Sequence, residues 1–299
     1  MDAKQPDLPD TSSVAMTAPL DQLADWFARA EAVVVGAGAG LSAAAGYEYG
    51  GERFRRLFPD FAAARGFTDM YSAGFFPFPT PEEKWAYWSR MILCNRYDPI
   101  PRPAVFADLL ALLRGRDCFV LTTNVDHCFQ RAGFDKARLF YTQGDYGLWQ
   151  CSLPCHARTY DNETAVREMV ARQRGMRIPA GLVPRCPVCG REMATNLRSD
   201  DTFVEDDGWH AAAARYADFL RRTANARTLF LDLGTGWNTP GIVKFPFWRM
   251  TLQRPSARYA SINLSPDANL PPDLAPRALH LPSDIAAALS ALRARPLPM

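Results

Sequence analysis

Apolar positions near the start of the chain follow a helical spacing and then merge into a short continuous run. Leu20, Leu23 and Phe27 recur at intervals of three and four residues, which predicts an amphipathic helix. The run at 32–35 is wholly apolar and has the length of a buried strand. The pattern therefore predicts a helix that leads directly into the first strand.

The same alternation continues through the rest of the chain. Further short apolar runs predict strands at 117–122, 138–142, 228–233 and 258–263, with helices at 103–113 and 208–223. Strands that alternate with helices predict an α/β fold with a doubly wound, parallel, Rossmann-like sheet. In such a sheet, ligands bind beyond the carboxyl ends of the strands.

Two segments interrupt the alternation. The first, at about 47–102, is helical, and Thr80 followed by Pro81 and Glu83 has the pattern of a helix N-terminus. Aromatic side chains in this segment favour core packing over the lining of a pocket; they are Phe75, Phe76, Phe78, Trp85, Tyr87 and Trp88. The second segment, at 148–196, carries paired cysteines.

These patterns predict the domain organisation. The Rossmann-like domain comprises 19–147 and 197–299, and a smaller inserted lobe combines the helical module with a zinc module at 148–196. Residues 1–18 are rich in proline, aspartate, serine and threonine, so we expect them to form a disordered leader.

A glycine-rich turn, Gly36-Ala37-Gly38-Ala39-Gly40-Leu41-Ser42, follows the first strand. Glycines let backbone amides approach a diphosphate, and the start of a helix adds free N–H groups. The spacing departs from the G-x-G-x-x-G fingerprint, because Leu41 stands at the third glycine, and no lysine follows as in a GxxxxGK[ST] loop. The turn alone predicts a phosphate site, with a purely structural turn as the alternative.

Composition narrows the class of protein. With 299 residues, 48% of them apolar, the chain is long enough to form a substantial core. The net charge of +2 and the absence of a basic run argue against a nucleic-acid partner. No apolar stretch is long enough to cross a membrane, and the start lacks the pattern of a signal peptide. We expect a cytoplasmic protein with neither a membrane nor a nucleic-acid partner.

Four cysteines form two close pairs, Cys151 with Cys155 and Cys186 with Cys189. Thiolates at this spacing suit tetrahedral zinc. Because an intracellular chain keeps its thiols reduced, zinc is favoured over disulfides or free thiols, with His156 as an alternative ligand. A metal with four protein ligands has no position left for substrate, so its expected role is structural.

Asn124 and Asp126 follow the strand at 117–122. Alone, this pattern is more often a turn or a helix cap than a site. The order of motifs along the chain changes that balance. A GAG-x-S loop, then TTNVD, a four-cysteine module, Gly234-Thr235-Gly236 and Ile262-Asn263 together resemble the sirtuin family from position 33 onward.

The resemblance implies that NAD binds in a cleft between the sheet domain and the smaller lobe. Asn124 is implied to orient the nicotinamide ribose, and Asp126 to hold the nicotinamide carboxamide. Arg53 is the only candidate to replace an arginine that the family carries after the first loop. The remaining residues implied to bind NAD are Gly38, Ala39, Gly40, Ser42, Gly234, Thr235, Gly236, Asn238 and Asn263.

Gln143 stands where deacylating sirtuins carry their catalytic histidine. A glutamine amide can position a ribose hydroxyl but cannot deprotonate it. We therefore expect Gln143 to position the hydroxyl without supporting the acyl transfer of deacylating sirtuins. The run at 142–151 and Asn238-Thr239-Pro240 resemble the macrodomain-linked (class M) sirtuins. That resemblance implies NAD-dependent ADP-ribosylation of a protein acceptor, such as a lipoylated carrier similar to the glycine-cleavage H protein, with a macrodomain ADP-ribosyl hydrolase as partner.

Three alternatives remain open at the level of sequence. One is a deacylase that uses His127, beside Asp126, as its base. The second is a hydrolase in which water replaces the acceptor. The third is a module that binds NAD or ADP-ribose without turnover.

Overall fold

The computed structural model describes residues 11–266 and 269–295. The described chain forms two compact units. Unit 1 contains the residues up to Leu41, Ala107–Leu121 and the residues from Asp218 onward, and unit 2 contains Ser42–Phe106 and Thr122–Ala217. The helical insertion and the cysteine module therefore belong to the same unit, which also takes in the segment from Thr122 to 147.

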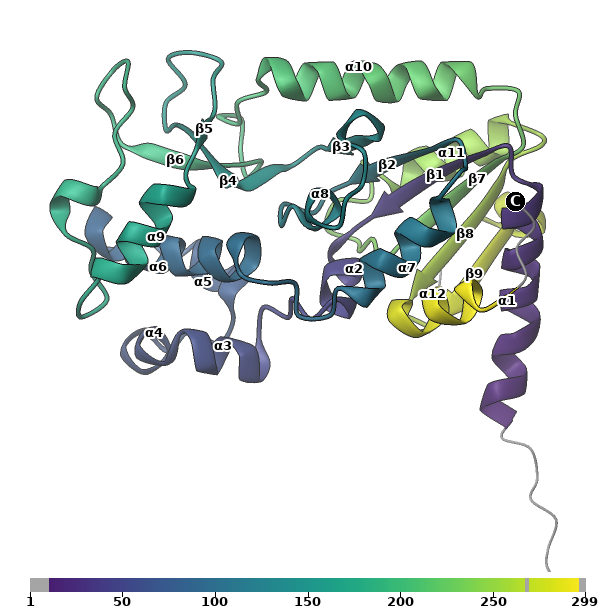
Figure 1. Ribbon diagram of the computed structural model, residues 1–299, viewed down its shortest axis with the longest axis horizontal. Helices are drawn as coiled ribbons and strands as arrows, with labels where there is room; N and C mark the ends of the chain where they lie inside the picture. The colour runs from purple at the N-terminus through teal and green to yellow at the C-terminus, as the bar shows by residue number, and fades with distance from the viewer. Residues whose placement is uncertain (1–10, 267–268, 296–299) are drawn as a thin grey trace, which may run out of the picture. The chain divides into compact units, whose positions relative to one another are not determined.

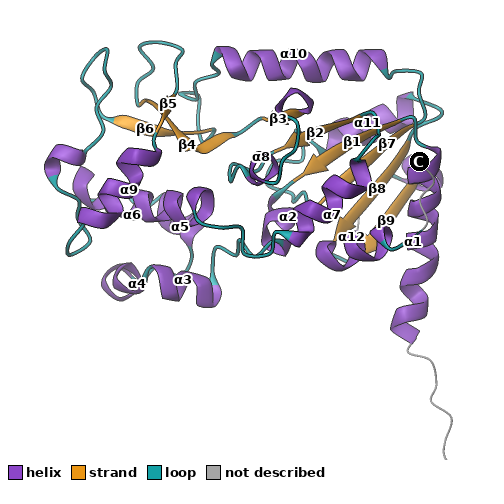
Figure 2. Ribbon diagram, in the orientation of Figure 1, coloured by secondary structure: helices purple, strands orange, loops and turns teal. Residues whose placement is uncertain are grey.

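A six-stranded sheet has the order β3-β2-β1-β7-β8-β9 (Figures 1 and 2). Its strands are β1 (Ala32–Ala37), β2 (Cys118–Thr122), β3 (Leu139–Tyr141), β7 (Thr228–Leu233), β8 (Arg258–Asn263) and β9 (Ala278–Pro282). β1 pairs with β7 in parallel, as do β7 with β8 and β8 with β9. The parallel α/β sheet expected from the sequence is thus confirmed.

Helices cover both faces of this sheet. In Figure 1, α11 (Lys244–Gln253) lies behind the strands and α12 (Ile285–Arg293) in front of them. The other long helices are α1 (Thr11–Arg29), α7 (Ala104–Leu113) and α10 (Asp207–Arg222). A Cβ atom on Gly36 would lie 2.2 Å from a Val243 methyl carbon, so the absence of a side chain there lets α11 pack closely on β1.

The helical part of unit 2 has an aromatic core. The elements of this helical part are α3 (Gly51–Leu57), α4 (Pro59–Arg65), α5 (Met70–Gly74), α6 (Pro81–Ile92), a π-helical turn (Leu93–Tyr97), α8 (Cys128–Arg131) and α9 (Glu163–Arg172). Thr80 caps α6 by accepting a hydrogen bond from the Glu83 amide, as predicted. Trp85 and Tyr87 are fully buried, which confirms core packing for them, but Phe75 is 64% exposed and does not belong to the core.

A second, three-stranded antiparallel sheet has the order β5-β4-β6. Its strands are β4 (Gly144–Cys151), β5 (Tyr160–Asp161) and β6 (Met193–Leu197). The sheet of the cysteine module therefore starts at Gly144, ahead of the expected boundary at 148.

The N-terminal helix starts earlier than the sequence analysis expects. Residues 1–10 of the expected leader lie outside the described residues, and α1 begins at Thr11. The helix therefore includes the last eight residues of the expected leader, 11–18. Ala15, Met16 and Ala18 are residues of high helix propensity, so the local sequence favours a helix in this stretch.

Candidate active site and zinc centre

The glycine-rich loop of unit 1 packs against the loop that follows β7. The Gly38 amide donates to the Leu233 carbonyl at 3.1 Å, and the Gly40 amide donates to the Gly234 carbonyl at 2.9 Å. A Cβ atom on Gly40 would lie 2.7 Å from the Gly234 Cα atom. These glycines therefore serve first to let two backbones meet, a structural role in addition to the predicted one at a diphosphate.

Residues predicted to lie near the adenosine ribose meet at this second loop. The Asn263 side-chain amide donates to the Thr235 carbonyl at 3.3 Å. The Thr235 hydroxyl donates to the buried Asp232 carboxylate at 2.6 Å. Gly236 and Asn238 lie on an exposed segment of the same loop, and Ala39, which is also exposed, is the first residue of the short helix α2 (Ala39–Ala44).

Sequence analysis missed the buried polar cluster beneath this loop. Asp232 is 1% exposed and also accepts from the Lys244 ammonium at 3.2 Å and the Tyr259 hydroxyl at 2.8 Å. A buried carboxylate needs such partners. The cluster fixes Thr235, and the only sequence signal for it is an acidic residue inside an otherwise apolar strand.

In unit 2, the predicted nicotinamide-side residues lie on two segments that run together. The Thr142 amide donates to the Thr122 carbonyl at 3.0 Å, and the Tyr146 amide donates to the Val125 carbonyl at 2.9 Å. Asn124 and Asp126 stand on the first segment and Gln143 on the second. These backbone bonds bring the three residues predicted to be catalytic into one neighbourhood.

Ser42 and Asp126 interact directly, although the sequence analysis assigned them to different parts of NAD. The Ser42 hydroxyl donates to one Asp126 carboxylate oxygen, and the Cys128 amide donates to the other at 2.9 Å. Both side chains are buried. The carboxylate is therefore already fixed in orientation by the protein.

Arg53 is anchored within the helical part of unit 2. Its guanidinium donates to the Glu48 carbonyl at 3.0 Å and to the Cys94 carbonyl at 2.8 Å. It also lies 5.3 Å from the centre of the Tyr47 ring, which favours a cation–π contact. These contacts give Arg53 a structural role, and its predicted contact with NAD stays a prediction.

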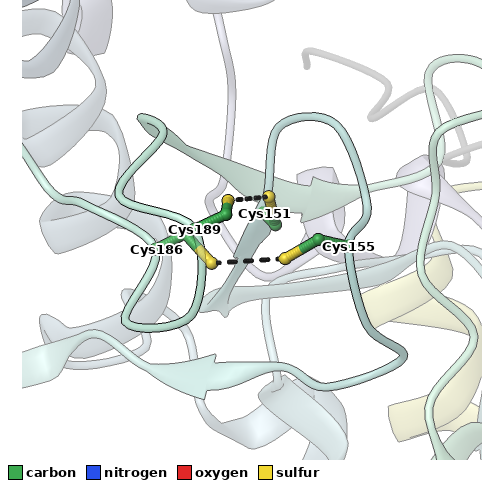
Figure 3. A group of neighbouring side chains, drawn as sticks. All are labelled: Cys151, Cys155, Cys186 and Cys189. Carbon is green, nitrogen blue, oxygen red and sulfur yellow. Dashed lines mark hydrogen bonds between the residues drawn. The ribbon is translucent and has the colours of Figure 1, made fainter.

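The four predicted cysteines converge in unit 2 (Figure 3). All four sulfur atoms lie within 4.8 Å of one another, with Cys151 to Cys189 at 3.5 Å and Cys155 to Cys186 at 3.7 Å. Thiolates around tetrahedral zinc are separated by about 3.8 Å, given Zn–S bonds of about 2.3 Å. A disulfide requires about 2.05 Å, so the cluster fits zinc and does not fit two disulfides.

Local backbone geometry supports the metal centre. Amides at Cys189 and Val188 lower the pKa of the Cys186 thiol to about 6, which favours the thiolate that zinc requires. Burial and the neighbouring thiols raise the pKa of Cys155. The imidazole Nε2 of His156 instead lies 2.7 Å from the Tyr160 hydroxyl. The four clustered cysteines could therefore hold a metal ion without His156.

Comparison with known proteins finds two relatives that are named as ADP-ribosyltransferases. No family model matches it. It is 40% identical over 257 residues to a protein ADP-ribosyltransferase of Staphylococcus aureus (strain Mu50), covering 86% of this chain and 81% of that protein. The chain belongs to the family of this protein ADP-ribosyltransferase. The chain is also 30% identical over 265 residues to a probable bifunctional ADP-ribose hydrolase/ADP-ribosyltransferase of Fusarium oxysporum f. sp. cubense. This match spans 83% of this chain but 42% of that protein.

Comparison with solved structures shows that the chain has the sirtuin (Sir2) fold. A structure from work on the mechanism and regulation of Sir2 enzymes matches with a TM-score of 0.58 and 20% identity, over 93% of this chain and 97% of that one. A Sir2 homologue in complex with NAD matches with a TM-score of 0.57 and 17% identity, over 91% of this chain and 92% of that one.

Among the described residues, no helix is both long and apolar enough to cross a membrane.

Proposed function

We propose that this sirtuin-fold protein cleaves the nicotinamide–ribose bond of NAD and transfers ADP-ribose to a protein acceptor. The observation that carries the proposal is the pairing of the Asn124–Asp126 segment with the Gln143 segment through the Thr142 and Tyr146 amides. Loss of nicotinamide requires orientation and electrostatic stabilisation. The polar side chains of Asn124, Asp126 and Gln143 suit that step, which does not require a basic group at position 143.

Each residue then has a defined task. Asn124 orients the nicotinamide ribose, Asp126 holds the carboxamide, and Gln143 positions a ribose hydroxyl without taking its proton. Gly38, Ala39 and Gly40 bind the diphosphate, with Ser42 fixing Asp126. On the adenosine side, the contacts come from Gly234, Thr235, Gly236, Asn238 and Asn263. Zinc held by the four cysteines stabilises unit 2 and takes no part in the chemistry.

The acceptor and partners follow from the class M resemblance, which we include in the proposal. We propose a lipoylated carrier protein similar to the glycine-cleavage H protein as the acceptor, and a macrodomain ADP-ribosyl hydrolase that removes the modification. The bifunctional name of the Fusarium relative supports the link between these two activities. A cytoplasmic location would keep the four thiolates reduced.

The proposal is tested by incubating the protein with NAD and candidate acceptors and measuring acceptor mass. We expect the lipoylated carrier to gain one ADP-ribose, and the Asn124→Ala variant to reduce this gain by at least about 100-fold, as expected for loss of an orienting group. Addition that survives in Asn124→Ala would contradict the site. Formation of acyl-ADP-ribose from an acylated peptide would instead support the deacylase alternative.

A further inference from the structure

A cavity lies at the amino-terminal edge of the sheet in unit 1. Its volume is about 200 Å³. Trp26 and Arg29 line it from the end of α1, Arg227 from the position before β7, and Arg258 from the first position of β8. All four residues belong to unit 1, so the cavity is a feature of one compact unit.

The cavity is separate from the residues of unit 1 that are predicted to bind NAD. β1, β7 and β8 run parallel, so they start at one edge of the sheet and end at the opposite edge. The glycine-rich loop and the loop at Gly234 follow the ends of β1 and β7, whereas the cavity lies where β7 and β8 start. β7 has six residues, and a strand rises about 3.3 Å per residue, so roughly 17 Å separate its two ends.

The lining of the cavity is positively charged. It contains three arginines and one aspartate, which gives a net charge of +2. Arg29 pairs with that aspartate, Asp25, at 2.8 Å, and Arg227 pairs with Glu31 at 3.1 Å. Because a guanidinium has five N–H donors, these pairs leave further donors on Arg29 and Arg227 for a ligand.

Arg258, the third arginine, has no carboxylate partner among the described residues. It donates from Nη1 to the Ala257 carbonyl at 2.9 Å, and its guanidinium lies 6.0 Å from the centre of the Trp26 ring. The ring attracts the cation and holds it at the wall of the cavity. A partly buried guanidinium without a counter-charge favours the binding of an anion.

The end of α1 does not oppose an anion here. The last carbonyls of a helix carry a partial negative charge, but two of them are occupied in this structure. Arg227 Nε donates to the Arg29 carbonyl at 3.0 Å, and Arg116 donates to the Phe27 carbonyl at 2.8 Å. These guanidinium groups compensate the helix end, so positive charge prevails at the cavity.

We propose that this cavity is a binding site for the phosphate group of a small molecule. Planar guanidinium groups match the oxygen pairs of a phosphate, and a phosphate offers enough oxygens for three arginines, whereas a carboxylate offers two. A volume of about 200 Å³ is below the roughly 300 Å³ at which pockets hold drug-sized ligands. The ligand is therefore inorganic phosphate or a small phosphomonoester.

The test titrates the full chain, by calorimetry and without NAD, with inorganic phosphate and separately with ribose 5-phosphate. We expect binding, weakened at least about 10-fold by Arg258→Ala, as for loss of hydrogen bonds to a charged group. Arg29→Ala should weaken it similarly, and because the Arg29 side chain is 75% exposed, this variant should fold. Arg249→Ala, which removes an exposed arginine of α11 outside the cavity, should leave affinity unchanged.

The two probes distinguish the sources of the phosphate group. Equal affinity would assign free phosphate to the cavity, and tighter binding of ribose 5-phosphate would assign a phosphomonoester. Three results would overturn the inference: no binding of either probe at millimolar concentration, binding that persists unchanged in Arg258→Ala and Arg29→Ala, as for phosphate at the glycine-rich loop, or an equal loss in Arg249→Ala. None of these results depends on the proposed function, because the titration involves no NAD.

Discussion

Gly40 shows how one residue serves both the fold and the predicted ligand site. A side chain there would meet the Gly234 backbone, where a Cβ atom would lie 2.7 Å from Cα and 2.9 Å from the carbonyl oxygen. Backbone atoms in a packed loop cannot move aside easily. The residue that the sequence assigns to a diphosphate is therefore also required for contact between the two loops of unit 1.

We predict that Gly40→Ala lowers the free energy of unfolding by about 1–3 kcal/mol, the usual cost of overpacking, and weakens NAD binding. Urea unfolding and NAD titration measure the two effects. Gly241→Ala is the matched control, because a Cβ atom there meets no atom within 4 Å. Equal stability of the two variants would show that the loops do not need the close approach.

Residue-scale contacts were only partly predictable. The spacing of the four cysteines predicted their cluster, whereas Asn124 and Asp126 were assigned to NAD only through the family resemblance. The pairs Ser42–Asp126 and His127–Asp145 join residues 84 and 18 positions apart, and no local pattern indicates such contacts. Asp232 was missed because a single acidic residue in an apolar strand gives no indication of its partners.

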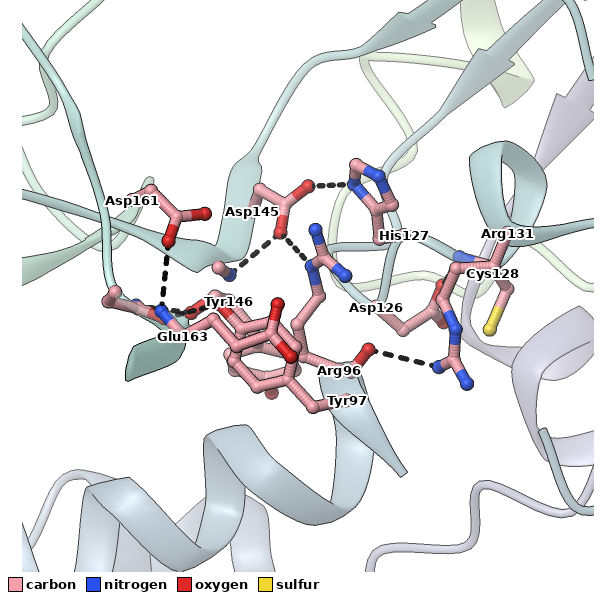
Figure 4. Close-up of polar contacts among 12 residues, drawn as sticks. Arg96, Tyr97, Asp126, His127, Cys128, Arg131, Asp145, Tyr146, Asp161 and Glu163 are labelled. Atoms are coloured by element: carbon pink, nitrogen blue, oxygen red, sulfur yellow. Dashed lines mark hydrogen bonds and ion pairs between the residues drawn. The ribbon is translucent and has the colours of Figure 1, made fainter. Parts of the chain in front are cut away.

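At the scale of elements, Asp145 joins β4 to the π-helical turn through Arg96 and to the loop before α8 through His127 (Figure 4). We predict that Asp145→Asn destabilises unit 2 by about 3 kcal/mol, because it leaves the largely buried Arg96 without its counter-charge. Glu163→Gln, which disrupts an exposed helical pair with Arg167, should cost less than about 0.5 kcal/mol.

The contribution of Asp145 to the free energy of unfolding should decrease in acid. The pKa of Asp145 is lower in the folded protein than its ordinary value of 3.8, so its stabilising effect is complete above about pH 4 and decreases as pH falls through the folded pKa. Urea midpoints of wild type and Asp145→Asn should therefore converge in acid. A constant difference between them down to pH 2 would contradict the assigned ion pair.

The four-cysteine cluster joins β4 to the hairpin before β6. We predict that Cys186→Ser, or a strong chelator, reduces bound zinc below one equivalent and opens the segment 151–193 to proteolysis, because structural zinc contributes directly to folding. Elemental analysis and limited digestion measure this. Cys118→Ala, which removes a cysteine on β2 outside the cluster, should keep its zinc, and loss of zinc in that control would contradict the ligand assignment.

Element prediction succeeded where hydrophobic patterns were strong. The bounds of β7 and β8 agree with the predicted ranges 228–233 and 258–263, because β7 and the centre of β8 are mostly apolar. β4 was missed because two glycines and polar residues interrupt its pattern. The segment containing β9 and α12 was also missed, although Asp284 caps α12 by accepting from the Ala287 amide, a signal that was present in the sequence.

At the scale of the whole molecule, the predicted NAD residues are divided between the two units. The chain passes from unit 1 to unit 2 after Leu41 and again after Leu121. These points fall within the glycine-rich motif and directly before the Thr122–Asp126 motif. Gly38 to Gly40 and the predicted adenosine-side residues therefore belong to unit 1, and Ser42, Asn124, Asp126 and Gln143 belong to unit 2.

The central claim is that NAD is split and its ADP-ribose portion moves to protein. The most direct measurement uses NAD labelled separately in the adenine and nicotinamide groups, incubated with the protein and the lipoylated carrier. We predict that adenine label enters the carrier, that nicotinamide label is released in at least the same molar amount, and that Asn124→Ala abolishes both. Release of nicotinamide without adenine label on any protein would contradict transfer, and retention of intact NAD would contradict catalysis at this site.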